Sequence, residues 1–507
     1  MKPSRTLNLW AACALAVVTL MPGLTVGNDT PSTNAPALKA SNSNPGPLPT
    51  TYEGSGPQPK VGTAEETVVG EMWGEHYSYV IPLFEIVAFE AALNWYDRTY
   101  RSGLDGDIYH TSLKTFEHNV KEWPVIDTDT FVINQLGHPY QGALFFNFGR
   151  SAGLSYWQSM MYSIGGEELW KTAGETDPPS WNDHIASGIG GTFLGEPLFR
   201  MANLVLEGGG EKPGFWRELG ATCISPPTGI NRLLFGDRFD TVFPSHNPPT
   251  FTQLRLGLNR TVRESDYGPV TTYDRQQETI DFLMAYGLPG KAGYTYDRPF
   301  DYFNLEASAG TGGKGAFNSI MSRGLLYGTD YDVGNAYRGV WGLYGSFDYI
   351  SPEVFRVSST AASLGTTAQW WLMPHVALQY SALGGVGYAA AGTIRGEGLR
   401  NYRYGATPQA LLALRLIMGD RAMVDANARE YYVSDLAGTS PPGDEVIERA
   451  NAGLTVRVYS QHALGLQVTS TTRDSHVVGI QDQRQTEQIV SVVYTLLGDN
   501  NFGVVDW

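Results

Sequence analysis

The sequence predicts an α+β protein in which a helical domain precedes a C-terminal antiparallel transmembrane β-barrel of about 12 strands. Charged residues make up only 17% of the chain and aromatic residues 12%, with 59 glycines, whereas average soluble domains carry about 25% charged residues. The mean hydropathy of −0.21 argues against a polytopic helical membrane protein. After about Pro249 apolar residues recur at every second position, which is the period of a strand. Low charge with this alternation favours a membrane barrel, apolar outside and polar inside.

The N-terminus has the order of an export signal. Lys2 and Arg5 precede an apolar stretch over residues 9–20, and small and turn residues follow. This order predicts a secretory signal peptide over residues 1–27. Residues 28–64 are rich in Pro, Ser, Thr, Asn and Gly, and such a segment buries too little apolar surface to offset its ordering entropy. We therefore expect a disordered linker over 28–64.

Residues 65–240 are expected to form the helical domain. The stretch 79–96 is largely apolar, but Glu85 and Glu90 interrupt it. A carboxylate at the centre of a lipid-exposed helix costs about 3 kcal/mol. We therefore expect this helix to be buried at a protein interface, with its glutamates paired or facing water.

Two further helical zones follow, at 142–170 and 180–206. Gly188, Gly191 and Gly195 are three and four residues apart, so they lie close to one helical face and allow another backbone to approach. Glu196 and Arg200 are four residues apart and are expected to pair across one turn.

Residues 250–507 are expected to form the barrel. Leu454 and Val456 share an apolar face, as do Val490 and Val492, while Thr455 points the other way. An even strand number is the rule in single-chain bacterial barrels. The segments centre near Leu256, Phe282, Leu305, Leu325, Leu343, Thr366, Leu378, Leu412, Ala426, Leu454, Leu466 and Val492.

Three stretches in the middle of the chain carry a family resemblance. They read LGHPYQGALFFNFGRSAGLSYW (136–157), PSWNDHIASGIGGTFLGE (179–196) and SPPTGINRLLFGD (225–237). They resemble the bacterial family catalogued as domain of unknown function 3943, closely over about residues 110–240. The resemblance implies an exported outer-membrane protein and supplies no activity, cofactor or site residue.

The helical domain also holds a candidate polar site. His138, Arg150, Asp183 and Glu196 lie in otherwise apolar stretches, and a buried charge needs a partner. We expect the four side chains to converge in one cluster, with Arg150 as the counter-charge of Asp183 or Glu196 through two hydrogen bonds. The principal interpretation of this cluster is structural.

Two catalytic interpretations of the same residues remain as alternatives. Ser151 with His138 and Asp183 is a conceivable hydrolase triad, although Ser151 lacks a Gly-x-Ser-x-Gly elbow. His138, Glu168 and Asp183 are a conceivable metal site, although no His-Glu-x-x-His motif is present. We therefore expect neither a metal nor a cofactor.

The net charge of −16 disfavours a nucleic-acid partner, which requires a basic surface. We expect a non-enzymatic outer-membrane barrel that is structural or passes a small or lipidic ligand. Its helical unit would face the periplasm or partly fill the lumen. One alternative is an outer-membrane enzyme acting on lipid or envelope polymer, and another is an adaptor that binds a periplasmic protein. The expected partners are thus outer-membrane lipid and, for an adaptor, a periplasmic protein.

Overall fold

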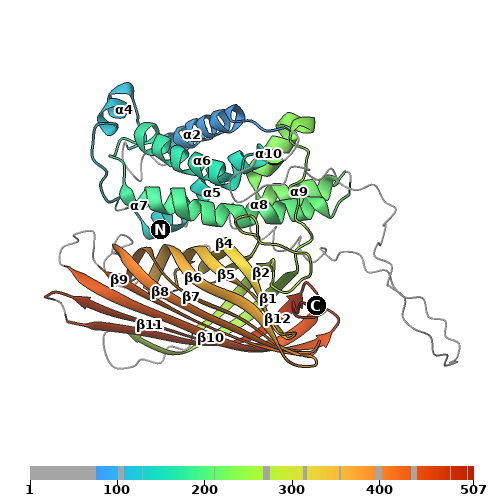
Figure 1. Cartoon of the computed structure of the whole chain (residues 1–507). Coiled ribbons are helices and arrows are strands. Elements are labelled where there is room, and N and C mark those ends of the chain that lie inside the picture. Colours follow the sequence, from blue (N-terminus) through green and yellow to red (C-terminus); the bar gives the residue numbers. More distant parts are fainter. Residues whose placement is uncertain are drawn as a thin grey trace, which may run out of the picture.

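The computed structural model describes residues 73, 76–100, 108–127, 129–210, 212–266, 275–311, 317–352, 355–393, 402–434, 442–479, 481–499 and 501–507. The predicted signal peptide (1–27) and linker (28–64) lie outside the described residues. Helices occupy the chain up to Arg238, and strands begin at Thr250. Figure 1 shows the helices as a layer lying along one side of a barrel.

In the described part of the chain, twelve antiparallel strands close into one barrel. Each of the twelve predicted segment centres falls in a different strand, so the fold prediction is confirmed. The barrel closes because β1 pairs with β12, for example Leu258 with Val492. The strands are β1 (Thr250–Asp266), β2 (Arg275–Tyr286), β3 (Phe303–Gly310), β4 (Ser319–Val333), β5 (Tyr337–Ile350), β6 (Phe355–Met373), β7 (Val376–Thr393), β8 (Tyr402–Met418), β9 (Ala422–Ser434), β10 (Gly443–Tyr459), β11 (His462–Val477) and β12 (Gln483–Leu497).

The two faces of the wall differ in polarity, because successive side chains of a strand point to opposite faces. Leu454, Val456, Val490 and Val492 point outward and are between 38% and 56% exposed. In register, Leu454 lies beside Leu466, and Leu466 beside Val492. These neighbours form a continuous apolar band around β1 and β9–β12, as a barrel in lipid requires.

The two ends of the barrel differ in their connections. At one end the strands are joined over 334–336, 374–375, 419–421 and 460–461, and we call this the short-turn end. β1 begins and β12 finishes at this end. The connections at the other end run over 267–274, 311–318, 351–354, 394–401, 435–442 and 478–482, and each is longer than those four. The short-turn end also carries one long connection, 287–302, between β2 and β3.

The lumen is filled at the short-turn end. After β12 the chain turns inward, so that Phe502 and Val505 are buried among inward-facing side chains of the strands. The connection from β2 to β3, residues 287–302, lies over the same rim. Its Tyr302 ring lies 6.1 Å from the ring of Tyr344 inside the barrel, and its Phe300 ring stacks 5.8 Å from Tyr156 of the helical layer.

The helical layer is built from short and medium helices with π-helical segments (η2–η4) between them, and a 3-10 turn (η5) follows. The elements are α2 (Val80–Tyr100), α4 (Leu113–Asn119), η2 (Ile133–Gly137), α5 (His138–Ser151), α6 (Tyr156–Leu169), η3 (Trp170–Gly174), α7 (Trp181–Asp183), η4 (His184–Gly190), α8 (Gly191–Glu207), α9 (Phe215–Ile224), α10 (Pro226–Phe235) and η5 (Gly236–Arg238). Among the described residues, no helix combines the length and the apolar character needed to cross a membrane.

Small residues bring α5, η4 and α8 together. A Cβ atom on Gly142 would lie 2.0 Å from the carbonyl oxygen of Ser187, and one on Gly191 would lie 2.8 Å from the backbone nitrogen of Ala143. Neither glycine therefore tolerates a side chain. Ser163 of α6 donates to the carbonyl oxygens of both Gly142 and Ser187, which joins the third helix to this crossing.

The helical layer packs on the outer wall of the barrel. Ser322 of β4 donates to the carbonyl oxygen of Phe193 in α8. The next residue of the strand, Arg323, lines the cavity, so Ser322 points outward. Asn182 of α7 donates to the hydroxyl of Tyr404, an outward residue near the start of β8. The expectation that the helical unit partly fills the lumen is therefore wrong for the described helices. Outward aromatic side chains of the strands dock the helices, while the tail and residues 287–302 fill the lumen.

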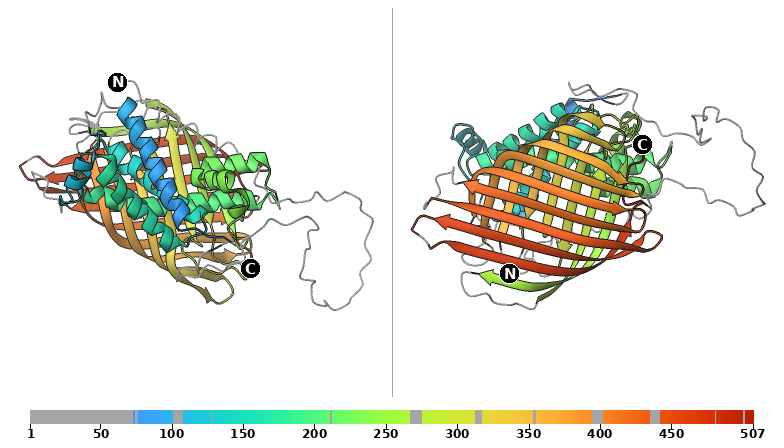
Figure 2. Two further views of the ribbon diagram at one scale, coloured as in Figure 1. Left: turned by 90° about the horizontal axis from the view of Figure 1, so that it is seen from above. Right: turned by 60° about the horizontal axis from the view of Figure 1, so that its bottom comes forward.

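The expectation for the stretch 79–96 is met only in part. One face of α2 packs on the protein, and Glu85 and Glu90 turn toward it. Glu90 is buried and one of its carboxylate oxygens has no hydrogen-bond partner among the described residues, so the expectation that the glutamates pair or face water is wrong for Glu90. The opposite face of α2 is not covered, and Phe84 is 69% exposed. Figure 2 shows α2 on the side of the helical layer that faces away from the barrel.

The apolar band can be tested by placing a charge on each face of the wall. Leu454→Arg is expected to destabilise the folded barrel by about 2–4 kcal/mol, because an arginine near the bilayer midplane loses its hydration. Gln467→Arg faces the cavity and is expected to cost under about 1 kcal/mol. Urea unfolding in phosphatidylcholine vesicles, followed by tryptophan fluorescence, measures both. Equal losses would contradict a lipid-facing band.

Candidate functional site

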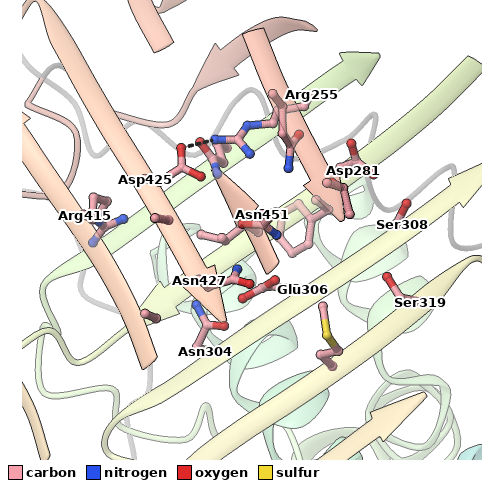
Figure 3. A pocket seen from close by; sticks show the side chains of 18 of the residues that line it. Arg255, Asp281, Asn304, Glu306, Ser308, Ser319, Arg415, Asp425, Asn427 and Asn451 are labelled. Carbon is pink, nitrogen blue, oxygen red and sulfur yellow. Dashed lines mark hydrogen bonds and ion pairs between the residues drawn. The ribbon is translucent and has the colours of Figure 1, made fainter. Parts of the chain in front are cut away.

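The barrel encloses a cavity of ≈ 240 Å³. Its walls are the inward-facing side chains of most of the strands, and its floor includes Phe251, Leu288 and Tyr302 beside the filled short-turn end. Figure 3 shows charged and amide groups from strands far apart in sequence facing one another across this space, among them Arg255, Asp281, Asn304, Glu306, Arg415, Asp425, Asn427 and Asn451.

The charges of the cavity balance. Its lining includes four arginines (Arg255, Arg323, Arg415 and Arg449) and four carboxylates (Asp281, Glu306, Asp425 and Glu487). Arg255 Nη2 lies 2.9 Å from Asp425 Oδ1, a contact that joins β1 to β9 across the lumen. The guanidinium of Arg415 lies 4.3 Å from the centre of the Phe251 ring at the floor and donates to Gln379. The cavity therefore offers donors and acceptors of both charge signs with no formal excess.

Two glutamines hold the tail that closes the floor. Gln369 Nε2 donates to the carbonyl oxygen of Val505 over 2.6 Å, and its Oε1 accepts from the backbone nitrogen of Val505 over 3.0 Å. Gln379 Nε2 donates to the carbonyl oxygen of Gly503 over 2.7 Å. Arg415 lines the cavity and also contacts Gln379, so the tail and the cavity share a hydrogen-bond network.

The predicted site residues of the helical layer fall into two clusters. In the first cluster, Arg150 holds both carboxylate oxygens of Glu196, over 2.8 and 3.1 Å. Arg200 donates to the same carboxylate over 2.8 Å and reaches Asp301 over 2.9 Å. The predicted pairings of Glu196 with Arg150 and Arg200 are thus present. Because Asp301 belongs to the rim connection 287–302, this cluster ties α5 and α8 to the short-turn end of the barrel.

The second cluster surrounds Lys171. Its ammonium lies 2.9 Å from Asp183, 2.8 Å from Glu175 and 3.5 Å from Asp127. His138 Nδ1 lies 3.9 Å from Glu167 on the same side. The expectation that His138, Arg150, Asp183 and Glu196 form one cluster is therefore wrong. His138 and Arg150 are twelve residues apart on α5, about 18 Å at 1.5 Å per residue, so they serve opposite ends of the helix.

Burial perturbs the protonation of the second cluster. Desolvation raises the pKa of Asp127, assisted by the charge of Asp183, and it raises the pKa of Glu167 well above its usual value. The carboxylates around Lys171 outweigh desolvation and hold its pKa well above the usual value. Lys171 is thus a fixed cation among carboxyl groups, some of which favour the protonated form.

The catalytic alternatives fit this geometry poorly. Ser151 and His138 lie at opposite ends of α5, and the Ser151 hydroxyl donates to the carbonyl oxygen of Asn147, so the triad is not assembled. Asp127, His138 and Asp183 offer ligand atoms within 4.8 Å of one another. The predicted third ligand, Glu168, instead contacts His184. Lys171 already supplies a positive charge to Asp127 and Asp183, which a metal ion would have to displace.

Sequence reasoning missed the cavity, Asp127 and Lys171. The inward charges of the barrel did leave a signal, because Arg449 and Asn451 alternate with apolar residues on β10, as Asn304 and Glu306 do on β3. That pattern marks a polar face but does not indicate which faces converge. Lys171 carried no signal, because a lone lysine after an apolar helix normally lies at the surface.

Removing the cation of the second cluster should destabilise the helical layer in a pH-dependent way. Lys171→Met leaves buried carboxylates without their counter-charge and is expected to cost about 3–5 kcal/mol. Without Lys171 the folded-state carboxyl pKa values rise further above their unfolded values, so the folded state binds more protons and stability falls as pH rises from about 4. The loss should be larger at about pH 8 than at about pH 5, measured by thermal unfolding with helical circular dichroism. Lys121→Met, at an exposed lysine paired with Glu117, is the control and should change little. A loss equal at both pH values would contradict this account.

Three solved outer-membrane proteins resemble the chain weakly. They are the toluene transporter TodX of Pseudomonas putida (10% identity, 49% of this chain and 89% of that chain, TM-score 0.20), the outer membrane channel DcaP of Acinetobacter baumannii (10%, 49% and 96%, 0.21) and OpdQ of Pseudomonas aeruginosa (10%, 50% and 98%, 0.20). At these TM-scores the likenesses carry no weight for function. No curated protein matches the sequence. Residues 123–227 match the family described as "Domain of unknown function (DUF3943)", so this part of the helical layer is a DUF3943 domain. The match includes the first two quoted stretches and only residues 225–227 of the third.

Proposed function

We propose that the protein is an outer-membrane β-barrel whose lumen binds and admits a small polar solute that is neutral or zwitterionic. The observation that carries the proposal is the cavity: charged and amide side chains converge on a space inside the barrel, whose exposed outer face is apolar. A polar lumen within an apolar exterior is the arrangement of barrels that hold water and solutes.

Size and charge narrow the solute. A cavity of ≈ 240 Å³ lies below the roughly 300–1,000 Å³ of pockets for drug-sized ligands, which favours a small molecule. Equal numbers of arginines and carboxylates in the lining favour a solute without net charge, because such a solute finds a partner for each polar group. The same lining disfavours a lipidic ligand, whose chain would strip these charges of water without replacing the hydrogen bonds.

The orientation follows the usual rule for such barrels, in which the short turns face the periplasm and the longer loops face outward. On this rule the C-terminal tail and the start of β1 lie on the periplasmic side. The chain passes from η5 to β1 over residues 239–249, so the helical layer joins the barrel from that side. Passage then requires the tail to leave the short-turn end, since Phe502 and Val505 occupy it.

The enzyme alternative has less support. Its candidate residues His138 and Asp183 are 4% and 0% exposed, so a substrate would need a path through the helical layer. In the adaptor alternative, a periplasmic protein would bind the side of the helical layer that faces away from the barrel. The exposed side chains of α2 on that side are apolar.

Breaking the balance of charge in the cavity should change ion selectivity. Asp425→Asn leaves Arg255 without its carboxylate and gives the lumen a positive excess, so the channel should shift toward anions. Reversal potentials in planar bilayers under a salt gradient measure the shift, with wild type expected to be weakly selective. Glu430→Gln removes a charge from the outward face of the same strand and should leave the reversal potential unchanged. Identical potentials for Asp425→Asn and wild type would argue against conduction through this cavity.

Loosening the tail should open the short-turn end. The double variant Gln369→Ala, Gln379→Ala removes three hydrogen bonds to residues 503–505 and should raise single-channel conductance above that of wild type. Gln467→Ala, at a cavity glutamine on β11, is the matched control. Conductance of the double variant equal to wild type, with heat-modifiable migration showing a folded barrel, would contradict closure by the tail.

A further inference from the structure

The outer face of α2 is apolar along nearly its whole length. Val80, Leu83, Phe84 and Val87 are between 45% and 69% exposed, and Ala88, Ala91 and Ala92 continue the same face. None of the charged residues between Val80 and Trp95 is on this face, because Glu85 and Glu90 turn inward. Contiguous apolar surface of this kind marks a contact with another protein or with a membrane.

The side of α2 that faces the protein is mixed. Ile86 packs there with Phe145 and Phe148, while Glu90 and Asp97 are buried and Asn94 donates to the carbonyl oxygens of Tyr109 and Gly174. The glutamates of α2 thus lie on the protein side, whereas a helix of a soluble domain normally turns its charged side chains to water. A helix with its carboxyl groups turned inward and an apolar face outward suits hydrocarbon, where an exposed polar group is costly.

Aromatic residues mark both ends of this face. Tyr77 and Tyr79 lie at the start of α2, and Trp95 and Tyr100 lie near its end, all between 45% and 64% exposed. Tyr and Trp gather where hydrocarbon meets the polar headgroups, so aromatic side chains at both ends of an exposed apolar face favour contact with lipid.

A second apolar patch lies on α9 and α10. Phe215, Trp216, Leu233 and Leu234 are between 66% and 83% exposed. Two charges on these helices are paired with each other, since Arg232 contacts Glu218 over 2.7 Å. Figure 1 shows α2 and α10 on the side of the helical layer that faces away from the barrel.

The helical layer also covers a part of the outer wall that would otherwise contact lipid. It follows the outer wall from Tyr404 near the start of β8 to Asp301 at the rim reached by β2, and these lie toward opposite ends of the barrel. On the rest of the wall the row Leu258, Val492, Leu466 and Leu454 is apolar and exposed. A bilayer that surrounds this band meets the helical layer where the layer covers the wall.

We propose that the outer faces of α2, α9 and α10 contact the acyl chains of the same bilayer that surrounds the barrel. The helical layer is then part of the membrane-embedded body and completes its lipid-facing perimeter on the side where it covers the barrel wall. This inference concerns the outside of the molecule and is independent of what the lumen binds.

Spin labels on single cysteines test the contact. The purified full chain carrying Cys13→Ser and Cys223→Ser receives Phe84→Cys or Val87→Cys on α2, Leu466→Cys on the barrel band, or Lys121→Cys just after α4. The side chain of Lys121 is exposed. Each labelled protein is folded into phosphatidylcholine vesicles, and electron paramagnetic resonance measures collisions with oxygen, which concentrates in lipid, and with a water-soluble nickel complex. Heat-modifiable migration in electrophoresis shows that each variant has folded. Two sites on α2 are used so that the contact is still tested if one of the two variants does not fold.

The expected result is a ratio of oxygen to nickel collisions at Phe84 and Val87 that matches Leu466 and exceeds Lys121 several-fold. Nickel collisions at both α2 sites as frequent as at Lys121 would place the face in water and overturn the inference, while leaving the barrel in lipid if Leu466 is protected. Few collisions with either reagent would mean that protein covers the face, which also overturns it. Nickel access at Leu466 itself would overturn the membrane barrel as well.

Discussion

Closure of the twelve-stranded sheet is the constraint on which the rest of the structure depends. Pairing of β1 with β12 gives every strand two neighbours, so the wall has no open edge with unpaired backbone groups. Once the wall is closed, the two-residue period of each strand assigns every side chain to the lumen or to the outside. The balanced charges around Arg255 and Asp425 and the apolar row through Leu454 are two consequences of that single assignment.

The helical layer uses the outside of the same wall. Outward aromatic residues such as Tyr404, Tyr349 and Phe303 dock it, and Phe193 packs among them. Inside the layer some charges form fully buried pairs, as in the double contact of Arg150 with Glu196. Removing one partner of such a buried pair is costly, because the other charge is left uncompensated. The first cluster therefore fixes the position of α8 against the rim, since Arg200 reaches Asp301 there.

The sequence predicts the barrel well and the site only in part, for physical reasons. Each strand carries its own local period, so all twelve segments could be found, and the four-residue spacing of Glu196 and Arg200 was enough to predict their pairing. The outward residues of β3 would be apolar whether lipid or a helix covers them, so docking of the helical layer on the wall could not be predicted. His138 and Asp183 do approach each other, but α5 separates them from Arg150, and the distance along a helix is known only once its bounds are. The cavity depends on the register of strands as distant as β1 and β9, and the sequence of one strand does not contain that information.

The central claim is that barrel and helical layer share one lipid-facing surface. Cryo-electron microscopy of the full chain in lipid nanodiscs measures this most directly, because the disc boundary is visible beside the protein. The account predicts that the helical layer lies within the thickness of the disc, with lipid density against α2 and continuous with that around β10–β12. A helical layer standing clear of the disc, with solvent against α2, would contradict it.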